Sequence, residues 1–179
     1  MKSQLTKTLA VTMTFIFAFT TVLFAQGNKS ERPSPPATAT GNIDGATITI
    51  NYSSPGVKGR KIWGGLVPYN KIWRAGANEA TLFKTDKDLQ VAGKDLPAGT
   101  YSLFAIPGKK EWTIIFNSQT GQWGINKNGA NLDPANNVLK VTVTPKETSK
   151  MYERLKYQIN DDSFSLIWEN LEVPIAVSR

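Results

Sequence analysis

The chain has 179 residues, enough for one domain with a hydrophobic core, and it contains neither cysteine nor histidine. Without these residue types it cannot form a disulfide, a thiol nucleophile, a Ser-His-Asp triad or a zinc site with thiolate or imidazole ligands. Its 21 Lys and Arg outnumber its 14 Asp and Glu, but the cations are scattered rather than gathered in the dense stripe of a nucleic-acid-binding protein. A metal would need an all-oxygen set of ligands, which suits calcium or magnesium at most. Our prediction is no metal, no cofactor and no nucleic-acid partner.

Residues 1–25 have the pattern of a cleavable signal peptide. Lys2 and Lys7 form a positive start, residues 9–25 carry no charge, and the small Ala25 offers a cleavage site. An uncleaved membrane anchor is the alternative, but the apolar run is at the short end of the roughly 17–25 residues that a spanning helix needs, and threonines dilute it. The prediction is an exported protein, periplasmic or extracellular, with no stable membrane insertion after the signal has been removed.

Residues 26–38 are rich in Pro, Ser, Thr and charge and contain almost nothing apolar. Such a segment cannot bury enough apolar surface to offset the conformational entropy that ordering would cost. We interpret it as a disordered linker between the signal peptide and a folded domain over residues 39–179.

Alternating apolar and polar residues, the period of a half-buried β-strand, dominate the rest of the chain. In the first example Ile48 and Ile50 alternate with threonines, and Asp44-Gly45 before them is a hairpin turn signal that pairs this strand with an earlier one. Similar runs, separated by turn residues, follow to the end of the chain. The predicted strands are residues 37–43, 48–52, 79–85, 89–91, 101–106, 112–116, 139–143, 155–159, 164–168 and 171–177.

This density of strands predicts an all-β domain. About eight to ten short strands are separated by turn residues, and no amphipathic helix of useful length interrupts them. Each strand has one polar and one apolar face, which favours two packed sheets over a closed barrel. The fold class that we expect is a single antiparallel β-sandwich of the jelly-roll kind.

Residues 53–78 interrupt the strand pattern for much longer than a sandwich connection normally takes. The segment contains five cations and three large aromatic side chains, and its first acidic neighbour is Glu79. Its five glycines permit tight backbone turns. Long loops with packed aromatic residues often carry function, so we expect the working surface of the domain here.

The same segment resembles a known family. The runs PGVKGRKIWGGLVPYNKIWRAGANEAT, AGKDLPAGTYSLFAIPG, EWTIIFN and QWG resemble those of secreted bacterial domains catalogued only as domain of unknown function family 2911. The resemblance extends over residues 39–176, most of the predicted domain. It implies export and a compact β-rich fold, and it implies no activity, substrate or catalytic residue.

Our first hypothesis is that this segment binds a small anionic or carbohydrate-like ligand. Arginine can hold a carboxylate, sulfate or phosphate with two hydrogen bonds, and an aromatic ring offers a flat apolar surface to a sugar. In the structural alternative the two tryptophans of the segment, Trp63 and Trp73, fill the end of the sandwich. Arg74 then pairs with Glu79 and stacks on Trp73. The predicted ligand-binding residues are Lys58, Arg60, Trp63, Tyr69, Trp73, Arg74, Asn78 and Glu79.

Two other functions remain open. One is a hydrolase or lyase in which Glu79 or Tyr69 transfers a proton while Arg74 or Lys58 stabilises negative charge. Glu79 is a weak catalytic candidate, because each acid that could act as its partner lies in an ordinary turn context. The other is a structural envelope component that assembles through an exposed sheet edge. We favour binding over both.

Overall fold

The computed structural model describes residues 28–179, so the predicted signal peptide lies outside the described residues and stays a prediction. The chain divides into two compact units, Met1–Arg32 and Pro33–Arg179. The described end of the first unit holds one short 3-10 helix, η2 (Lys29–Glu31), and the second unit holds every strand. Within residues 28–179, no helix has the length and apolar character needed to cross a membrane.

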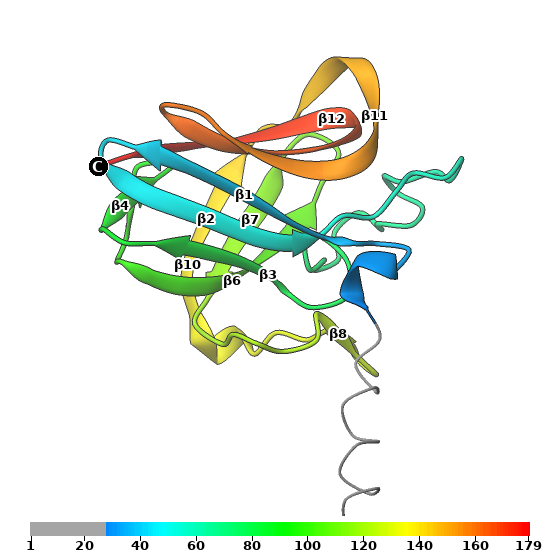
Figure 1. Ribbon diagram of the computed structural model, residues 1–179, viewed down its shortest axis with the longest axis horizontal. Coiled ribbons are helices and arrows are strands. Elements are labelled where there is room, and N and C mark those ends of the chain that lie inside the picture. The colour runs from blue at the N-terminus through cyan, green and yellow to red at the C-terminus, as the bar shows by residue number, and fades with distance from the viewer. Residues whose placement is uncertain (1–27) are drawn as a thin grey trace, which may run out of the picture. The chain divides into compact units, whose positions relative to one another are not determined.

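The larger sheet has six antiparallel strands, which stand side by side in the order in which they occur in the chain, with other strands inserted after β3 and after β7 (Figure 1). Its first hairpin turns at Asp44 and Gly45, whose φ angles of 48° and 77° are those of the two-residue turn predicted from this Asp-Gly pair. In sheet order the strands are β1 (Pro36–Ile43), β2 (Ala46–Ser53), β3 (Thr81–Thr85), β6 (Gly99–Pro107), β7 (Trp112–Asn117) and β10 (Asn137–Val143).

The smaller sheet has four antiparallel strands, two of them long. It is built from the β11–β12 hairpin and from a short hairpin inserted between β3 and β6. A separate two-stranded hairpin and a 3-10 helix, η3 (Pro134–Asn136), lie between β7 and β10. The strands are β11 (Lys146–Ile159), β12 (Ser163–Ser178), β4 (Leu89–Val91) and β5 (Lys94–Leu96) in the sheet, and β8 (Ile125–Asn126) and β9 (Gly129–Ala130) in the separate hairpin.

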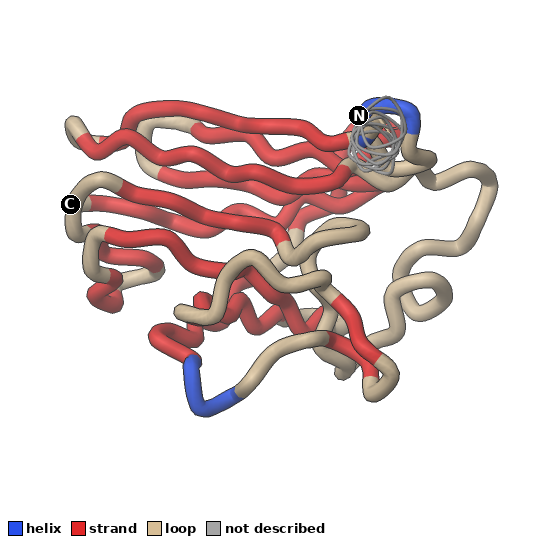
Figure 2. Tube along the Cα trace, turned by 60° about the horizontal axis from the view of Figure 1, so that its bottom comes forward, coloured by secondary structure: helices blue, strands red, loops and turns tan. Residues whose placement is uncertain are grey.

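The apolar faces of the two sheets pack against each other, which confirms the predicted antiparallel β-sandwich. Ile48 and Ile50 of β2 are fully buried, whereas the intervening threonine is not, as the period of two requires. Phe83 of β3 contacts Phe164 of β12 with ring centroids 5.1 Å apart, so the rings bridge the sheets. Figures 1 and 2 show these strands in layers, with the irregular segment between β2 and β3 projecting at one end.

The end of the predicted linker, residues 36–38, belongs to the sheet and not to a disordered segment. β1 begins at Pro36, which pairs with Ser53, and the Thr38 hydroxyl lies 2.8 Å from the Asn51 side-chain oxygen. Backbone pairing with β2 holds this edge strand without large apolar side chains, and proline is tolerated at the start of an edge strand. The compositional boundary at residue 38 is therefore too late, whereas the strand predicted from residue 37 begins within one residue of β1.

The β11–β12 hairpin is longer than predicted. β11 begins at Lys146 rather than at residue 155, and its first half is exposed except for the half-buried Thr148 and Tyr152, so no apolar alternation marks it. Pairing with β12 holds it, as between Lys146 and Glu172. The predicted strands 164–168 and 171–177 are one strand, in which Glu169 adopts a φ of 53° without ending the pairing. The short strands β5, β8 and β9 were not predicted, because turn residues surround β5 and no apolar alternation marks β8 or β9.

Candidate functional site

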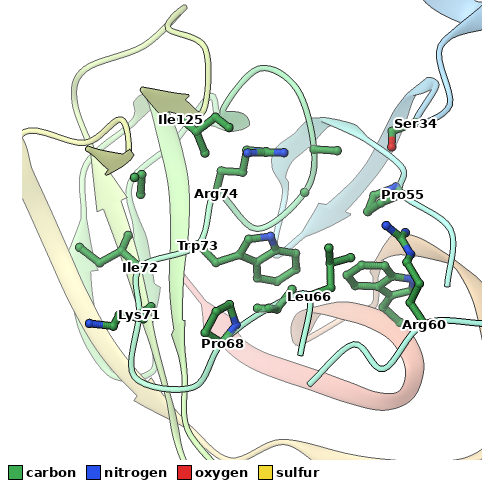
Figure 3. A pocket seen from close by; sticks show the side chains of 16 residues that line it. Ser34, Pro55, Arg60, Leu66, Pro68, Lys71, Ile72, Trp73, Arg74 and Ile125 are labelled. Carbon is green, nitrogen blue, oxygen red and sulfur yellow. The ribbon is translucent and has the colours of Figure 1, made fainter. Parts of the chain in front are cut away.

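A cavity of about 370 Å³ lies beside the segment between β2 and β3. Most of its wall comes from residues 55–77 of that segment, and the β8–β9 hairpin and β12 supply much of the rest. Figure 3 shows the Trp73 ring in the middle of this wall, with the Arg74 side chain on one side and Leu66 and Pro68 near the other. The volume falls within the range of about 300–1,000 Å³ that is typical of ligand pockets.

Backbone pairing with β6 fixes the part of the segment that carries Trp73. The Trp73 N–H donates to the Ala105 carbonyl at 2.7 Å, and the Ala105 N–H donates back to Trp73 at 2.8 Å. Three residues earlier, the Asn70 N–H donates to the Pro107 carbonyl at 2.8 Å. The segment is therefore held as a short extension of the larger sheet, and Trp73 has a rigid support.

Four of the five tryptophans form one cluster behind the cavity. Trp73 and Trp168 both line the cavity, and their rings are stacked with centroids 6.0 Å apart and planes 18° from parallel. Trp63 packs edge-on against both, and against Trp112 at 4.9 Å. The predicted roles of the loop tryptophans therefore separate: Trp63 is buried in the core, and Trp73 is half-buried in the cavity wall.

Arg74 is the half-buried cation of the cavity wall. Burial lowers the pKa of its guanidinium, whereas an adjacent carboxylate would act in the opposite direction. Its Nε–H group is buried and has no hydrogen-bond partner in the described part of the chain. A Cβ atom at Gly124 would lie 2.3 Å from Arg74 Cδ, so only glycine lets the arginine stem lie against this backbone.

Two further cations lie at the cavity. Arg60 is exposed, and its guanidinium donates to the carbonyls of Val57 at 3.1 Å and Gly56 at 2.5 Å. These two hydrogen bonds stabilise the backbone turn that precedes Arg60. Lys71 is exposed as well. Of the sixteen described residues that line the cavity, three are cations, and none is acidic or carries a side-chain amide.

The other predicted ligand-binding residues lie outside the wall of this cavity. The backbone N–H of Lys58 donates to the Glu153 carboxylate at 2.9 Å, and the Asn78 amide donates to the Ser34 carbonyl at 3.0 Å. These two contacts hold the chain in place. The five residues outside the wall are Lys58, Trp63, Tyr69, Asn78 and Glu79.

Glu79 and Tyr69, the predicted proton-transfer groups, are not brought together with the arginines in this cavity. The backbone of Glu79 forms a β-bridge with Trp123, and Tyr69 is half-buried against the core. The structure thus gathers three of the eight predicted ligand-binding residues at one cavity: Arg60, Trp73 and Arg74.

Sequence reasoning missed several residues of the wall. Lys71 was counted among the cations of the loop but was not assigned to the site. Leu66, which follows two glycines, was given no role. Gly124, which lies outside the wall but packs against the Arg74 stem, belongs to the QWG run that carries the family resemblance, and sequence reasoning assigned it no role. Nothing in the sequence indicated Trp168 or the β8–β9 hairpin, because only the fold brings them to the cavity.

A buried hydrogen-bond pair fixes the backbone next to Arg74. The hydroxyls of Tyr157 and Thr81 donate to the Ala75 carbonyl at 2.8 and 3.0 Å. Ala75 adopts a left-handed φ of 51°, which turns the chain directly after Arg74. Burial raises the pKa of the Tyr157 hydroxyl well above its ordinary value, so this donor keeps its proton in the folded protein.

Alkaline pH is expected to remove the stabilisation that Tyr157 provides. Above pH 10.0, its ordinary pKa, the unfolded tyrosine loses its proton while the folded one retains it, so the free energy of unfolding falls as pH rises. We expect the advantage of the natural chain over Tyr157→Phe to shrink by up to about 1.4 kcal/mol per pH unit. Urea unfolding of both proteins between about pH 8 and pH 11 measures this. A constant difference across that range would contradict it.

The comparisons with known proteins give one match. A family model described as "Protein of unknown function (DUF2911)" matches residues 34–177. No curated protein and no solved structure matches the chain. The matched region covers nearly the whole compact unit Pro33–Arg179, including every residue of the cavity wall.

Proposed function

This chain belongs to the DUF2911 family, whose description assigns no activity, and from that premise we propose that its β-sandwich binds a small anion in the cavity beside Trp73. Arg74 is the anchor of the anion, Lys71 and the free part of Arg60 add positive charge, and Trp73 forms an apolar wall. The support for this proposal comes from the chemistry of the lining side chains, not from a relative of known function.

The single observation that carries the proposal is that the charged lining side chains are all hydrogen-bond donors. Arginine and lysine donate and cannot accept, and the described wall contains no carboxylate and no side-chain amide, so that the Ser34 hydroxyl is its one side-chain acceptor. Sugar hydroxyls both donate and accept, so a carbohydrate site needs acceptors beside its aromatic surface. Of the two ligand classes predicted from the sequence, an anion therefore fits this wall better than a carbohydrate.

The position of Arg74 strengthens its attraction for an anion. A charge that is partly removed from water interacts more strongly with a counter-charge, because the effective dielectric constant is lower than at an open surface. A guanidinium can also form two parallel hydrogen bonds to a carboxylate, sulfate or phosphate. The Nε–H group of Arg74 has no partner in the described chain but is closed off from the cavity by burial, so we assign the contact with the anion to the terminal nitrogens of the guanidinium.

We expect sulfate, phosphate and acetate to shift the amide NMR signals around Trp73 and Arg74, and glucose to leave them unchanged. Arg74→Gln should weaken anion binding by about tenfold or more, since a hydrogen bond to a charged group contributes about 1.5–3 kcal/mol. Titrations at constant ionic strength measure the dissociation constants. Arg74→Lys, which keeps the charge but loses the planar fork, should bind with intermediate affinity.

Lys84→Gln is the matched control, because it removes an exposed cation of β3 outside the cavity wall. It should bind anions as the natural chain does, and thermal unfolding should show that Arg74→Gln is folded. An equal loss in Lys84→Gln would mean that anions respond only to overall charge. Binding of glucose without binding of any anion would replace the proposed function with carbohydrate recognition.

A further inference from the structure

Exposed aliphatic side chains surround the cationic cavity. In residues 28–179, six large apolar side chains are exposed: Leu66, Ile72, Trp123, Ile125, Val138 and Met151. Three of the six line this one cavity: Leu66 at 47 %, Ile72 at 39 % and Ile125 at 45 % of their surface. Single exposed apolar residues are common, whereas several around one polar centre are typical of a binding site.

These side chains come from two separate parts of the chain. Leu66 lies in the segment between β2 and β3, and Ile125 begins the β8–β9 hairpin. In Figure 3 Ile125 lies next to Arg74, and Leu66 lies at the edge of the Trp73 ring. The apolar part of a ligand whose anionic head contacts Arg74 would therefore lie against Ile125 on one side or against Trp73 and Leu66 on the other.

We propose that the anion bound here carries a compact apolar tail, so that the ligand class is an amphipathic organic anion such as a short alkyl carboxylate. This inference rests on the proposed function and deepens it. Arg74 holds the charged head, and Leu66, Ile125 and the Trp73 ring cover the tail. A bare inorganic anion would leave these apolar surfaces in water, and a neutral hydrocarbon would leave the cations without a counter-charge.

The cavity also limits the size of the ligand. About 370 Å³ holds a small molecule and not an extended lipid chain. We therefore expect affinity to rise with tail length and then to stop rising once the tail extends beyond Leu66 and Ile125. A series of carboxylates with one head group and increasing tails separates the two contributions.

The experiment titrates acetate, butanoate, hexanoate and octanoate into the full domain, with hexanol as the neutral analogue. Each added methylene should tighten binding by about two- to fourfold over the first steps. Hexanol should bind at least about tenfold more weakly than hexanoate, because it lacks the charge–charge contact with Arg74. Tryptophan fluorescence and calorimetry provide two independent readouts.

The variants Leu66→Ser and Ile125→Ser remove the proposed tail surface and leave the cations in place. Both positions are exposed, so the fold should be retained. Each variant should flatten the dependence on tail length, so that the affinity for hexanoate falls much more than the affinity for acetate. Val138→Ser, which changes an equally exposed side chain of β10 outside the cavity, is the control and should leave the whole series unchanged.

The outcomes separate this inference from the proposed function. If acetate, butanoate, hexanoate and octanoate bind equally, with the same dependence on Arg74, the tail surface is not used and the inference is wrong, although anion binding stands. If no anion binds, both are wrong. If hexanol binds as tightly as hexanoate, the cavity is a neutral apolar site, which also overturns both. A regular increase that Leu66→Ser and Ile125→Ser abolish supports the inference.

Discussion

Replacing Trp63 by alanine is expected to lower the free energy of unfolding by about 3–5 kcal/mol, the usual cost of removing a large buried aromatic side chain. Only 6 % of Trp63 is exposed, and its ring contacts three other indoles at centroid distances of 4.9, 5.7 and 5.9 Å. Its removal therefore leaves a void that rigid neighbouring rings cannot easily fill. Urea unfolding followed by circular dichroism measures the change.

Trp123→Ala is the matched control for this prediction. Trp123 is the one tryptophan outside the four-ring cluster, and 47 % of its surface is exposed, so its loss should cost much less. Trp63→Phe keeps an aromatic ring in the cluster and should recover part of the stability. Equal destabilisation by Trp63→Ala and Trp123→Ala would show that the cluster is not the part of the core we take it to be.

Removing both hydroxyls from the Ala75 carbonyl is expected to cost more than the sum of the single changes. Tyr157→Phe and Thr81→Val each remove one hydrogen bond and leave the other, so each should cost about 1 kcal/mol. In the double variant the buried carbonyl loses both side-chain donors, which should add about 1–3 kcal/mol beyond that sum. The double-mutant cycle is measured by chemical denaturation of the four proteins.

The double variant also tests how Arg74 is positioned. Ala75 follows Arg74 directly, so releasing the Ala75 carbonyl should weaken anion binding even though neither Thr81 nor Tyr157 lines the cavity. Tyr52→Phe is a suitable control, because the Tyr52 ring packs against Tyr157 but its hydroxyl accepts from a different backbone group, the Tyr157 N–H. Purely additive energies would indicate that other groups satisfy the carbonyl once both hydroxyls are gone.

The strands could be predicted from the sequence wherever one face of the strand is buried and the other is exposed to solvent. β2 shows this, since Ile48 and Ile50 are buried between exposed or half-buried polar residues. The prediction failed where strands are held by backbone pairing alone. The first half of β11 is largely exposed, so it lacks the alternation that marks a half-buried strand.

The residues of the candidate site could be predicted from the sequence only in part. The long segment between β2 and β3 was predicted as the working surface, and Arg60, Trp73 and Arg74 from it do line the cavity. Proximity in sequence did not separate them from Asn78 or Trp63, because a turn of the backbone decides which side chain faces the cavity. Contributions from distant strands, such as Trp168, depend on the packing of the two sheets, which no local pattern records.

The stacked pair Trp73 and Trp168 joins the cavity wall to the core of the sandwich. Its two rings lie within about 6 Å of each other and are surrounded by two more, a spacing at which electronic transitions of neighbouring indoles couple. A molecule that settles against Trp73 therefore perturbs a shared excited state and not one isolated ring. The near-ultraviolet circular dichroism spectrum of the unlabelled protein should therefore change when a ligand occupies the cavity.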